Sequence, residues 1–162
     1  MIYQTGIVTV SDKGAAGERE DTAGPLAAEM LRDAGFEVAY TSIVPDEADE
    51  IRRELIHCAD ELGLALVLTS GGTGFSPRDI TPEATLAVIE RRAPGIPEAM
   101  RAESMKITNR AMLTRSEAGI RGRTLIINLP GSPKAVRENL VAVLPALEHS
   151  LDMLRKPQED HV

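Results

Sequence analysis

Strand-like and helix-like segments alternate over the first 90 residues of this 162-residue chain, and this order constrains its fold most. Apolar, β-branched runs cover 5–11, 36–44 and 64–70, and segments with a helical spacing of apolar residues cover 25–35, 46–63 and 82–92. Strands joined by helices predict an α/β fold, with a mostly parallel sheet covered by helices on both faces. We expect a further clear strand at 124–130 and a long helix after 133, which Pro145 should kink or split.

Composition and charge argue against several classes of protein. Apolar residues make up 43% of the chain, too many for a disordered segment. A formal net charge of -7 and only 2% aromatic residues argue against a nucleic-acid partner, because phosphates would be repelled and bases would find few rings to stack on. No apolar run reaches the roughly 20 residues that a membrane span needs.

These features predict a cytoplasmic protein with no membrane partner. The N-terminus begins directly as a strand and lacks a signal-peptide pattern. We expect a single domain over residues 1–156 and a frayed tail at 157–162. The single cysteine, Cys58, cannot form a disulfide within the chain and is expected to be a buried, inert thiol.

Polar and glycine-rich stretches follow four of the predicted strands. Ser11 and Asp12 follow the first, Asp46 the second, TSGGTGFSPRD (69–79) the third and NLPGSP (128–133) the last. The carboxyl ends of parallel strands meet at one edge of a sheet, where α/β proteins bind their ligands. We therefore expect one site at this edge, with Asp46 and Asp79 facing each other across a cleft.

Two carboxylates beside a glycine loop indicate a magnesium–phosphate site. Carboxylate and phosphate oxygens hold the cation, and backbone N–H groups bind the remaining phosphate charge. Arg78 is a candidate phosphate partner. Simpler interpretations stay open: Asp46 as a helix N-cap with or without a catalytic role, Asp79 as a surface-loop acid, GGTG as a tight turn and PGSP as a strand-to-helix turn. P-loop, HExxH and GxSxG motifs are absent, as is GxGxxG after the first strand.

Four ordered motifs resemble the molybdopterin-binding MogA/MoaB family, which includes bacterial molybdopterin adenylyltransferases and the G domain of gephyrin. They are VPDE (44–47), TSGGTGFSPRDITPEAT (69–85), PGIPEAMR (94–101) and LTRSEAGIRGRTLIINLPGSPKAV (113–136), so the resemblance covers nearly the whole chain. It implies a three-layer α/β/α sandwich that assembles as a homotrimer. It also implies adenylylation of molybdopterin by Mg-ATP with release of pyrophosphate, and hand-over of the product to a molybdate-inserting protein.

The strand-end pattern and the resemblance together give candidate site residues. Asp46 and Asp79 are the candidate catalytic and Mg²⁺-binding acids. The candidate nucleotide-binding residues are Ser70, Gly71, Gly72, Thr73, Gly74, Pro130, Gly131 and Ser132. The candidate substrate-binding residues are Ser11, Asp12, Arg78, Thr114, Arg115 and Ser116. Thr114 stands where many relatives have serine, and Ser132 where several have asparagine or glutamine.

Other functions are compatible with the same motifs. The main alternative is a MoaB-like protein that binds molybdopterin without adenylylating it. Some relatives of that type lack the Arg-Asp pair before TPEA, so Arg78 and Asp79 favour the enzyme. A molybdenum-insertase module and a scaffold role, as in gephyrin, are disfavoured because we expect no further domain. A generic nucleotide-binding sandwich is the remaining alternative.

Overall fold

The computed structural model describes residues 2–156, so the predicted frayed tail lies outside the described residues. Within them the chain forms a six-stranded sheet in the order β2-β1-β3-β6-β5-β4. The strands are β1 Gln4–Val10, β2 Glu37–Val44, β3 Leu66–Ser70, β4 Arg91–Arg92, β5 Ala118–Arg121 and β6 Thr124–Leu129. The first four in this order are parallel, and β5 pairs antiparallel with both β6 and β4. The prediction of a mostly parallel sheet is confirmed.

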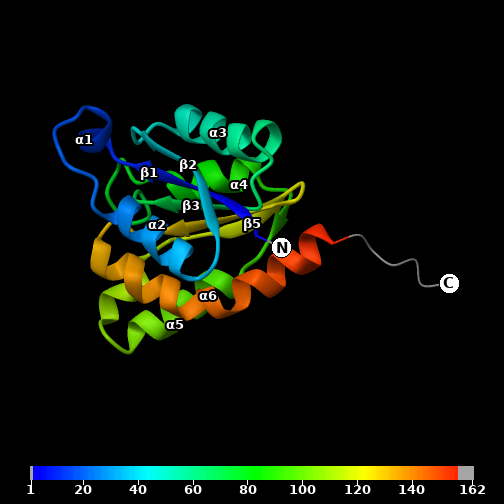
Figure 1. Ribbon diagram of the computed structural model, residues 1–162. Coiled ribbons are helices and arrows are strands. Elements are labelled where there is room, and N and C mark those ends of the chain that lie inside the picture. The colour runs from blue at the N-terminus through cyan, green and yellow to red at the C-terminus, as the bar shows by residue number, and fades with distance from the viewer. Residues whose placement is uncertain (1, 157–162) are drawn as a thin grey trace.

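Helices cover both faces of this sheet (Figure 1). They are α1 Asp12–Ala15, α2 Ala23–Asp33, α3 Ala48–Ile56, α4 Thr81–Val88, α5 Gly95–Met105 and α6 Pro133–Arg155, with a π-helical turn at His57–Glu61 and a 3₁₀ turn at Asn109–Leu113. One face packs against α2, α5 and α6, and the other against α3 and α4. The expected three-layer α/β/α arrangement is therefore confirmed.

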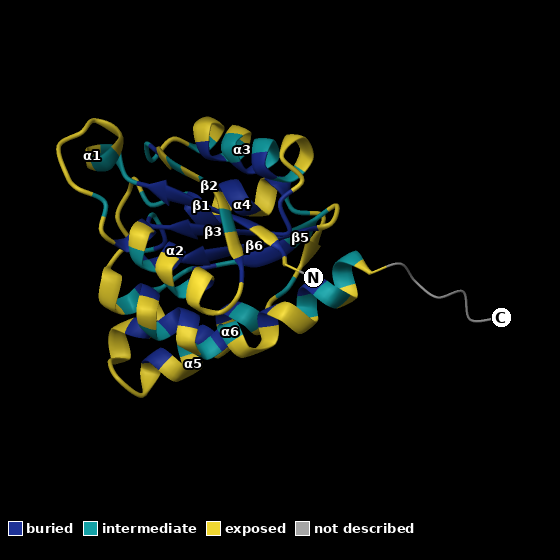
Figure 2. Ribbon diagram, viewed as in Figure 1, coloured by how far each residue is buried: buried dark blue, intermediate teal, exposed yellow. Residues whose placement is uncertain are grey.

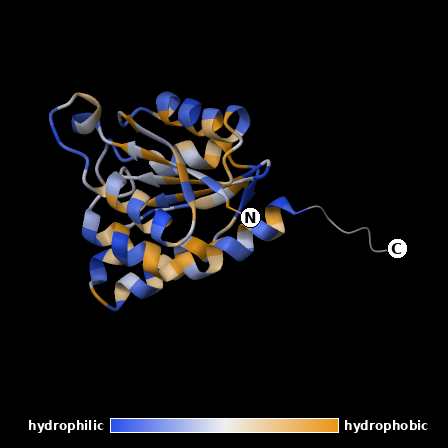
Figure 3. Cartoon of the chain, in the orientation of Figure 1, coloured by the Kyte–Doolittle hydropathy of each residue, from blue (hydrophilic) through white to orange (hydrophobic). Residues whose placement is uncertain are grey.

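Alternation along β3 shows how one strand contributes to both layers of the core. Leu66 and Leu68 lie in the cluster that contains Leu31 of α2 and Leu140 of α6, whereas Val67 lies in the opposite cluster. Every residue of β3 is buried (Figure 2), as expected for a strand with helices on both sides. Hydrophilic residues of α3 face away from the sheet (Figure 3). Strand β3 thus lies inside the sheet, between β1 and β6. Its carboxyl end sets the position of the glycine loop that follows.

The helix predicted over 82–92 is shorter than expected. Helix α4 ends at Val88, and the next residues join the sheet as β4. The Glu90 amide donates to the Ile120 carbonyl at 2.8 Å, and the Ala93 amide donates to the Ala118 carbonyl at 2.8 Å. Pairing with β5 therefore replaces the last helical turn. This pairing is a tertiary contact, so the local sequence pattern does not predict it.

Pro145 does not split the long helix, so of the predicted kink or split the split is wrong. Helix α6 is continuous from Pro133 to Arg155 with Pro145 inside it. A proline removes the hydrogen bond to the carbonyl four residues earlier, which here belongs to Val141. Both residues are exposed, so water can satisfy this carbonyl without breaking the helix.

Candidate active site

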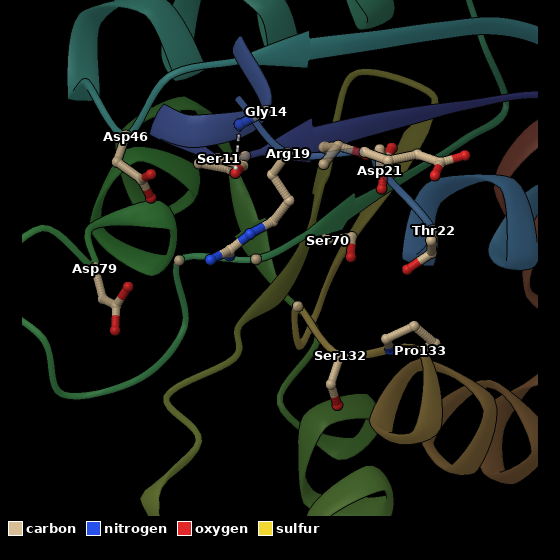
Figure 4. Close-up of a pocket in the computed structure, with 16 residues that line it drawn as sticks. Ser11, Gly14, Arg19, Asp21, Thr22, Asp46, Ser70, Asp79, Ser132 and Pro133 are labelled. Atoms are coloured by element: carbon tan, nitrogen blue, oxygen red, sulfur yellow. Dashed lines mark hydrogen bonds between the residues drawn. The ribbon is translucent and has the colours of Figure 1, made fainter. Parts of the chain in front are cut away.

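A pocket of about 520 Å³ opens at the carboxyl ends of the parallel strands (Figure 4). It is bounded by the ends of β1 and β3, the loops that follow these two strands, Asp46 two residues after the end of β2, and the start of α6. Eight candidate residues line it: Ser11, Asp46, Ser70, Gly71, Gly72, Asp79, Gly131 and Ser132. The structure thus gathers the four predicted stretches at one edge of the sheet, as their spacing indicates.

The glycines after β3 are required by the close approach of other groups. Gly71 has φ +105°, and a Cβ there would lie 2.3 Å from the carbonyl oxygen of Val10. Gly72 has φ +70°, and its Cβ would lie 2.2 Å from the buried Oγ1 of Thr81. Both backbone angles also lie in the region that residues with a Cβ rarely adopt. The loop therefore presents bare backbone to the pocket, which suits close contact with an anion.

Asp46 is anchored to Asp12, just after β1, and does not cap α3. Its Oδ2 accepts a hydrogen bond from the Asp12 amide at 2.8 Å, and its own amide donates to Oδ1 of Asp12 at 2.9 Å. The N-cap position of α3 is Glu47, with no side-chain hydrogen bond, so the N-cap interpretation of Asp46 is wrong. Burial raises the pKa of the Asp46 carboxyl, and the charges of Asp12 and Asp79 add to this increase.

Asp79 lines the pocket from the far end of the glycine loop. Its Oδ2 accepts the Ser76 amide at 3.0 Å, which folds the loop into a turn. A Cβ at Gly74 would lie 2.9 Å from the same oxygen. Figure 4 shows the Asp46 and Asp79 carboxylates on the same side of the pocket, although they come from the ends of different strands.

Arg78 is paired with acids in this structure. Its guanidinium donates to both carboxylate oxygens of Asp12 at 3.0 Å and to Glu47 at 2.9 Å. This contact lowers the pKa of Asp12. Neither Arg78 nor Asp12 lines the pocket, so the structure does not bring these two candidates into it. They join the ends of β1, β2 and the glycine loop instead.

Arg115 holds the glycine loop in place by hydrogen bonds from outside the pocket. Its amide donates to the Thr73 carbonyl at 2.8 Å, its Nε to the Gly74 carbonyl at 2.8 Å, and its guanidinium to the Asp79 carbonyl at 2.7 Å. Thr114 donates a hydrogen bond to the backbone of its own 3₁₀ turn.

Besides Asp12 and Arg78, six candidates lie outside the pocket lining: Thr73, Gly74, Pro130, Thr114, Arg115 and Ser116. Their predicted contacts with substrate stay predictions.

Ser132 combines two of the interpretations of the PGSP stretch. Its Oγ accepts the Ala135 amide at 3.2 Å and so caps α6, while the residue also lines the pocket. Ser70 at the end of β3 donates to the Pro130 carbonyl at 2.9 Å. The strand-to-helix turn after β6 is therefore held against the glycine loop.

The donor set fits a cation that the substrate helps to hold. Within residues 2–156 no group of three or more His, Cys, Asp and Glu side chains is placed to hold a metal. Asp46 and Asp79 alone supply too few oxygens for the six that Mg²⁺ takes. Mg²⁺ usually keeps several waters and binds one or two carboxylates together with substrate phosphates. The residues present therefore fit a Mg²⁺–phosphate complex better than an isolated ion.

The sequence reasoning missed the part of the pocket that follows β1. Its lining residues there are Gly14, Arg19, Glu20, Asp21 and Thr22, with Thr9 and Val10 in β1 and Pro133 in α6. Asp21 accepts Thr9 Oγ1 at 2.7 Å and the Gly24 amide at 3.0 Å, which ties this loop to β1 and α2. The available signal was a polar, glycine-containing loop directly after a buried strand.

In the part of the chain that the structure describes, no helix is long and apolar enough to cross a membrane.

Comparisons with known proteins agree on one family. The model of a probable molybdopterin binding domain matches residues 6–149. The chain is 44% identical over 151 residues to a molybdopterin adenylyltransferase of Helicobacter pylori, covering 92% of this chain and 86% of that protein. Its structure matches that of the molybdopterin biosynthesis enzyme MoaB of Thermus thermophilus with a TM-score of 0.91 and 51% identity, covering 98% and 100% of the two chains. It matches a MogA structure with a TM-score of 0.88 and 40% identity, covering 93% and 99%. The chain therefore belongs to the molybdopterin-binding MogA/MoaB family.

Proposed function

We propose that this protein acts in molybdenum cofactor biosynthesis by transferring the adenylyl group of Mg-ATP to molybdopterin. A phosphate oxygen of molybdopterin attacks the α-phosphorus of ATP, the bond from that phosphorus to the bridging oxygen breaks, and pyrophosphate leaves. The observation that carries this proposal is that Asp46, Asp79 and the bare glycine backbone line one pocket. Similarity to proteins named molybdopterin adenylyltransferase supports the choice of substrates.

The two acids would hold Mg²⁺ together with the phosphates of ATP. A cation held by Asp46 and Asp79 would supply positive charge to the polyphosphate. Asp46 fits this role because two hydrogen bonds with Asp12, each between a backbone amide and a carboxylate oxygen, fix its position. Asp79 is fixed in turn by the Ser76 amide. Preorganised carboxylates need no rearrangement when the substrates bind, which is how such sites lower a barrier.

The glycine loop and the turn before α6 would hold the nucleotide. Gly71 and Gly72 leave space for phosphate oxygens to reach the backbone. Gly131 lies opposite, where a Cβ would approach the Gly71 Cα at 3.4 Å. The N-terminus of α6 adds a favourable dipole for an anion at this wall. These residues position substrate and need not take part in covalent chemistry.

Binding of molybdopterin without adenylylation is the second candidate. Relatives named MoaB have this fold, and their names alone do not separate transfer from binding. Arg78 favours transfer here, because it locks Asp12, and Asp12 in turn positions Asp46. A fixed Asp46 carboxylate is what a cation site for adenylyl transfer needs.

The substitution Asp79→Asn tests the proposal. Asparagine keeps an oxygen that can accept the Ser76 amide, so we expect a folded protein. Loss of one of two metal-binding charges should lower the rate of pyrophosphate release by about a hundredfold or more, the scale seen when a catalytic electrostatic group is removed. Asp33→Asn, at the exposed end of α2, is the matched control and should retain full activity. Full activity of Asp79→Asn would contradict the metal-site assignment. Wild-type protein that binds molybdopterin but releases no pyrophosphate with Mg-ATP would favour the binding role.

The homotrimer and the hand-over of product to a molybdate-inserting protein remain proposals drawn from the family. Sedimentation velocity measures the first directly. A clean monomer at micromolar concentration would contradict it.

A further inference from the structure

The proposed chemistry places a strongly anionic substrate in an acidic pocket. Four of the residues that line it are acids: Glu20, Asp21, Asp46 and Asp79. A cation between Asp46 and Asp79 would offset only part of this charge. Polyphosphate binding therefore requires a further positive group at the pocket.

Arg78 does not meet this requirement in the described structure. Its guanidinium is shared between Asp12 and Glu47, and it does not line the pocket. Moving it to a phosphate would break three hydrogen bonds and leave both acids without their partner. Its role is to hold the strand ends together.

Arg19 is the basic residue among those that line the pocket. It is exposed, and within residues 2–156 the structure records no ion pair or hydrogen bond for its guanidinium. Figure 4 shows the side chain extending from the loop after β1 toward the side of the pocket where Asp79 lies. We propose that Arg19 binds a phosphate group of a substrate in the pocket that Asp46 and Asp79 also line, an inference that rests on the proposed function.

The loop that carries Arg19 is anchored on both sides of it. Before it, Ser11 Oγ accepts the Gly14 amide at 3.0 Å, and the Glu18 amide donates to the Lys13 carbonyl at 2.8 Å. After it, Asp21 accepts two hydrogen bonds that tie it to β1 and α2. The backbone of Arg19 is therefore held near the pocket while its long side chain stays free to reach a ligand.

Arginine suits this position because it is charged at every relevant pH and binds two phosphate oxygens at once. Phosphates occur in both proposed substrates, ATP and molybdopterin, and the two are separated by measurement. An increase in KM for ATP alone would place the contact on the nucleotide. An increase for molybdopterin alone would place it on the pterin phosphate.

The test compares Arg19→Gln and Arg19→Lys with the wild type. Arg91→Gln, on the exposed strand β4 at the far edge of the sheet, is the matched control for loss of one positive charge. The measurements are KM for each substrate, and the affinity for Mg-ATP and for molybdopterin by calorimetry at low and high salt. Arg19→Gln should weaken one of the two substrates about tenfold, since hydrogen bonds to charged groups have that strength. Arg19→Lys should fall between, and the salt dependence should be smaller in Arg19→Gln than in the wild type.

The outcomes separate this inference from the proposed function. Active wild type with an Arg19→Gln variant that matches Arg91→Gln in both KM values would overturn the inference alone. Wild type whose Mg-ATP affinity depends on Arg19, but which releases no pyrophosphate, would support the inference and overturn adenylyl transfer. Wild type that binds neither Mg-ATP nor molybdopterin would overturn both.

Discussion

Replacing Gly71 by alanine tests whether the pocket depends on the contact between the glycine loop and β1. The Cβ of Gly71→Ala would lie 2.3 Å from the Val10 carbonyl oxygen, whereas ordinary contacts are 3.4–4 Å. Because this oxygen belongs to backbone, no side-chain rotation can relieve the overlap. The loop must move away from β1 by about 1 Å, which is the difference between these distances.

Gly35→Ala is the matched control. Gly35 has φ +94°, close to the +105° of Gly71, but a Cβ there would meet nothing within 4 Å. Both variants should lose about 1–2 kcal/mol of unfolding free energy, from a backbone penalty of about 2 less about 0.5 gained by restricting the unfolded chain. Overpacking should add about 1–3 kcal/mol for Gly71→Ala alone, giving a total of about 2–5 kcal/mol. A domain of this size should survive that loss at 25 °C, since stabilities are about 5–15 kcal/mol.

Urea unfolding followed by circular dichroism measures both losses, and calorimetry with Mg-ATP measures the effect on the pocket. Gly71→Ala should be the less stable variant and should lose nucleotide affinity, whereas Gly35→Ala should keep it. Equal losses in the two variants, to within about 0.5 kcal/mol, would refute the steric reasoning, because additive errors for distant sites are of that size. Unchanged Mg-ATP affinity in a destabilised Gly71→Ala would refute the role of the loop in nucleotide binding.

Three further predictions concern buried or half-buried polar groups. Asn128→Ala removes three hydrogen bonds that join β6 to β3, α4 and the segment before β5, and should cost about 2–4 kcal/mol in urea unfolding; a loss under about 1 would show that the network is dispensable. Hydrogen bonding to Glu54 raises the pKa of Tyr40 to about 12, and hydrogen bonding to Asp152 raises that of Tyr3, from an ordinary value of 10.0 in each case. Near pH 10 the folded state therefore keeps phenol protons that the unfolded state loses, so the free energy of unfolding should fall as the pH rises from 10 through 12. A rise in phenolate absorbance at pH 10 in the native protein would contradict this. Burial raises the pKa of Cys58 to about 12, so a thiol reagent should label it only after unfolding, and rapid native labelling would contradict its burial.

The order of the elements was predictable because local pattern carries it. Uninterrupted apolar runs such as 64–70 mark strands buried on both faces, and the buried β3 agrees with this. The parallel sheet follows from the alternation, and the shared edge of the strand ends follows from the sheet. Asp46, Asp79 and Gly71 could therefore be assigned to one pocket from spacing and resemblance.

The partners of charged and helix-ending groups were not predictable, because they depend on distances between segments far apart in the chain. Pairing with β5 ended α4 early, although the local pattern favoured helix to residue 92. Asp46 stands where a cap is expected, yet the nearby β1 end offers the Asp12 amide, and that contact prevails.

The sequence by itself thus determined which strand ends come together at one edge of the sheet, since the order of the elements sets the direction of each strand. Only the tertiary structure decided what each side chain does there. Arg78 adjoins the glycine loop in sequence but is neutralised by Asp12 and Glu47, whereas Arg19, in a loop with no motif, reaches the pocket unpaired among the described residues. The physical reason is that charge pairing falls off over a few ångströms, so a shift of one loop decides which arginine is left to bind a ligand.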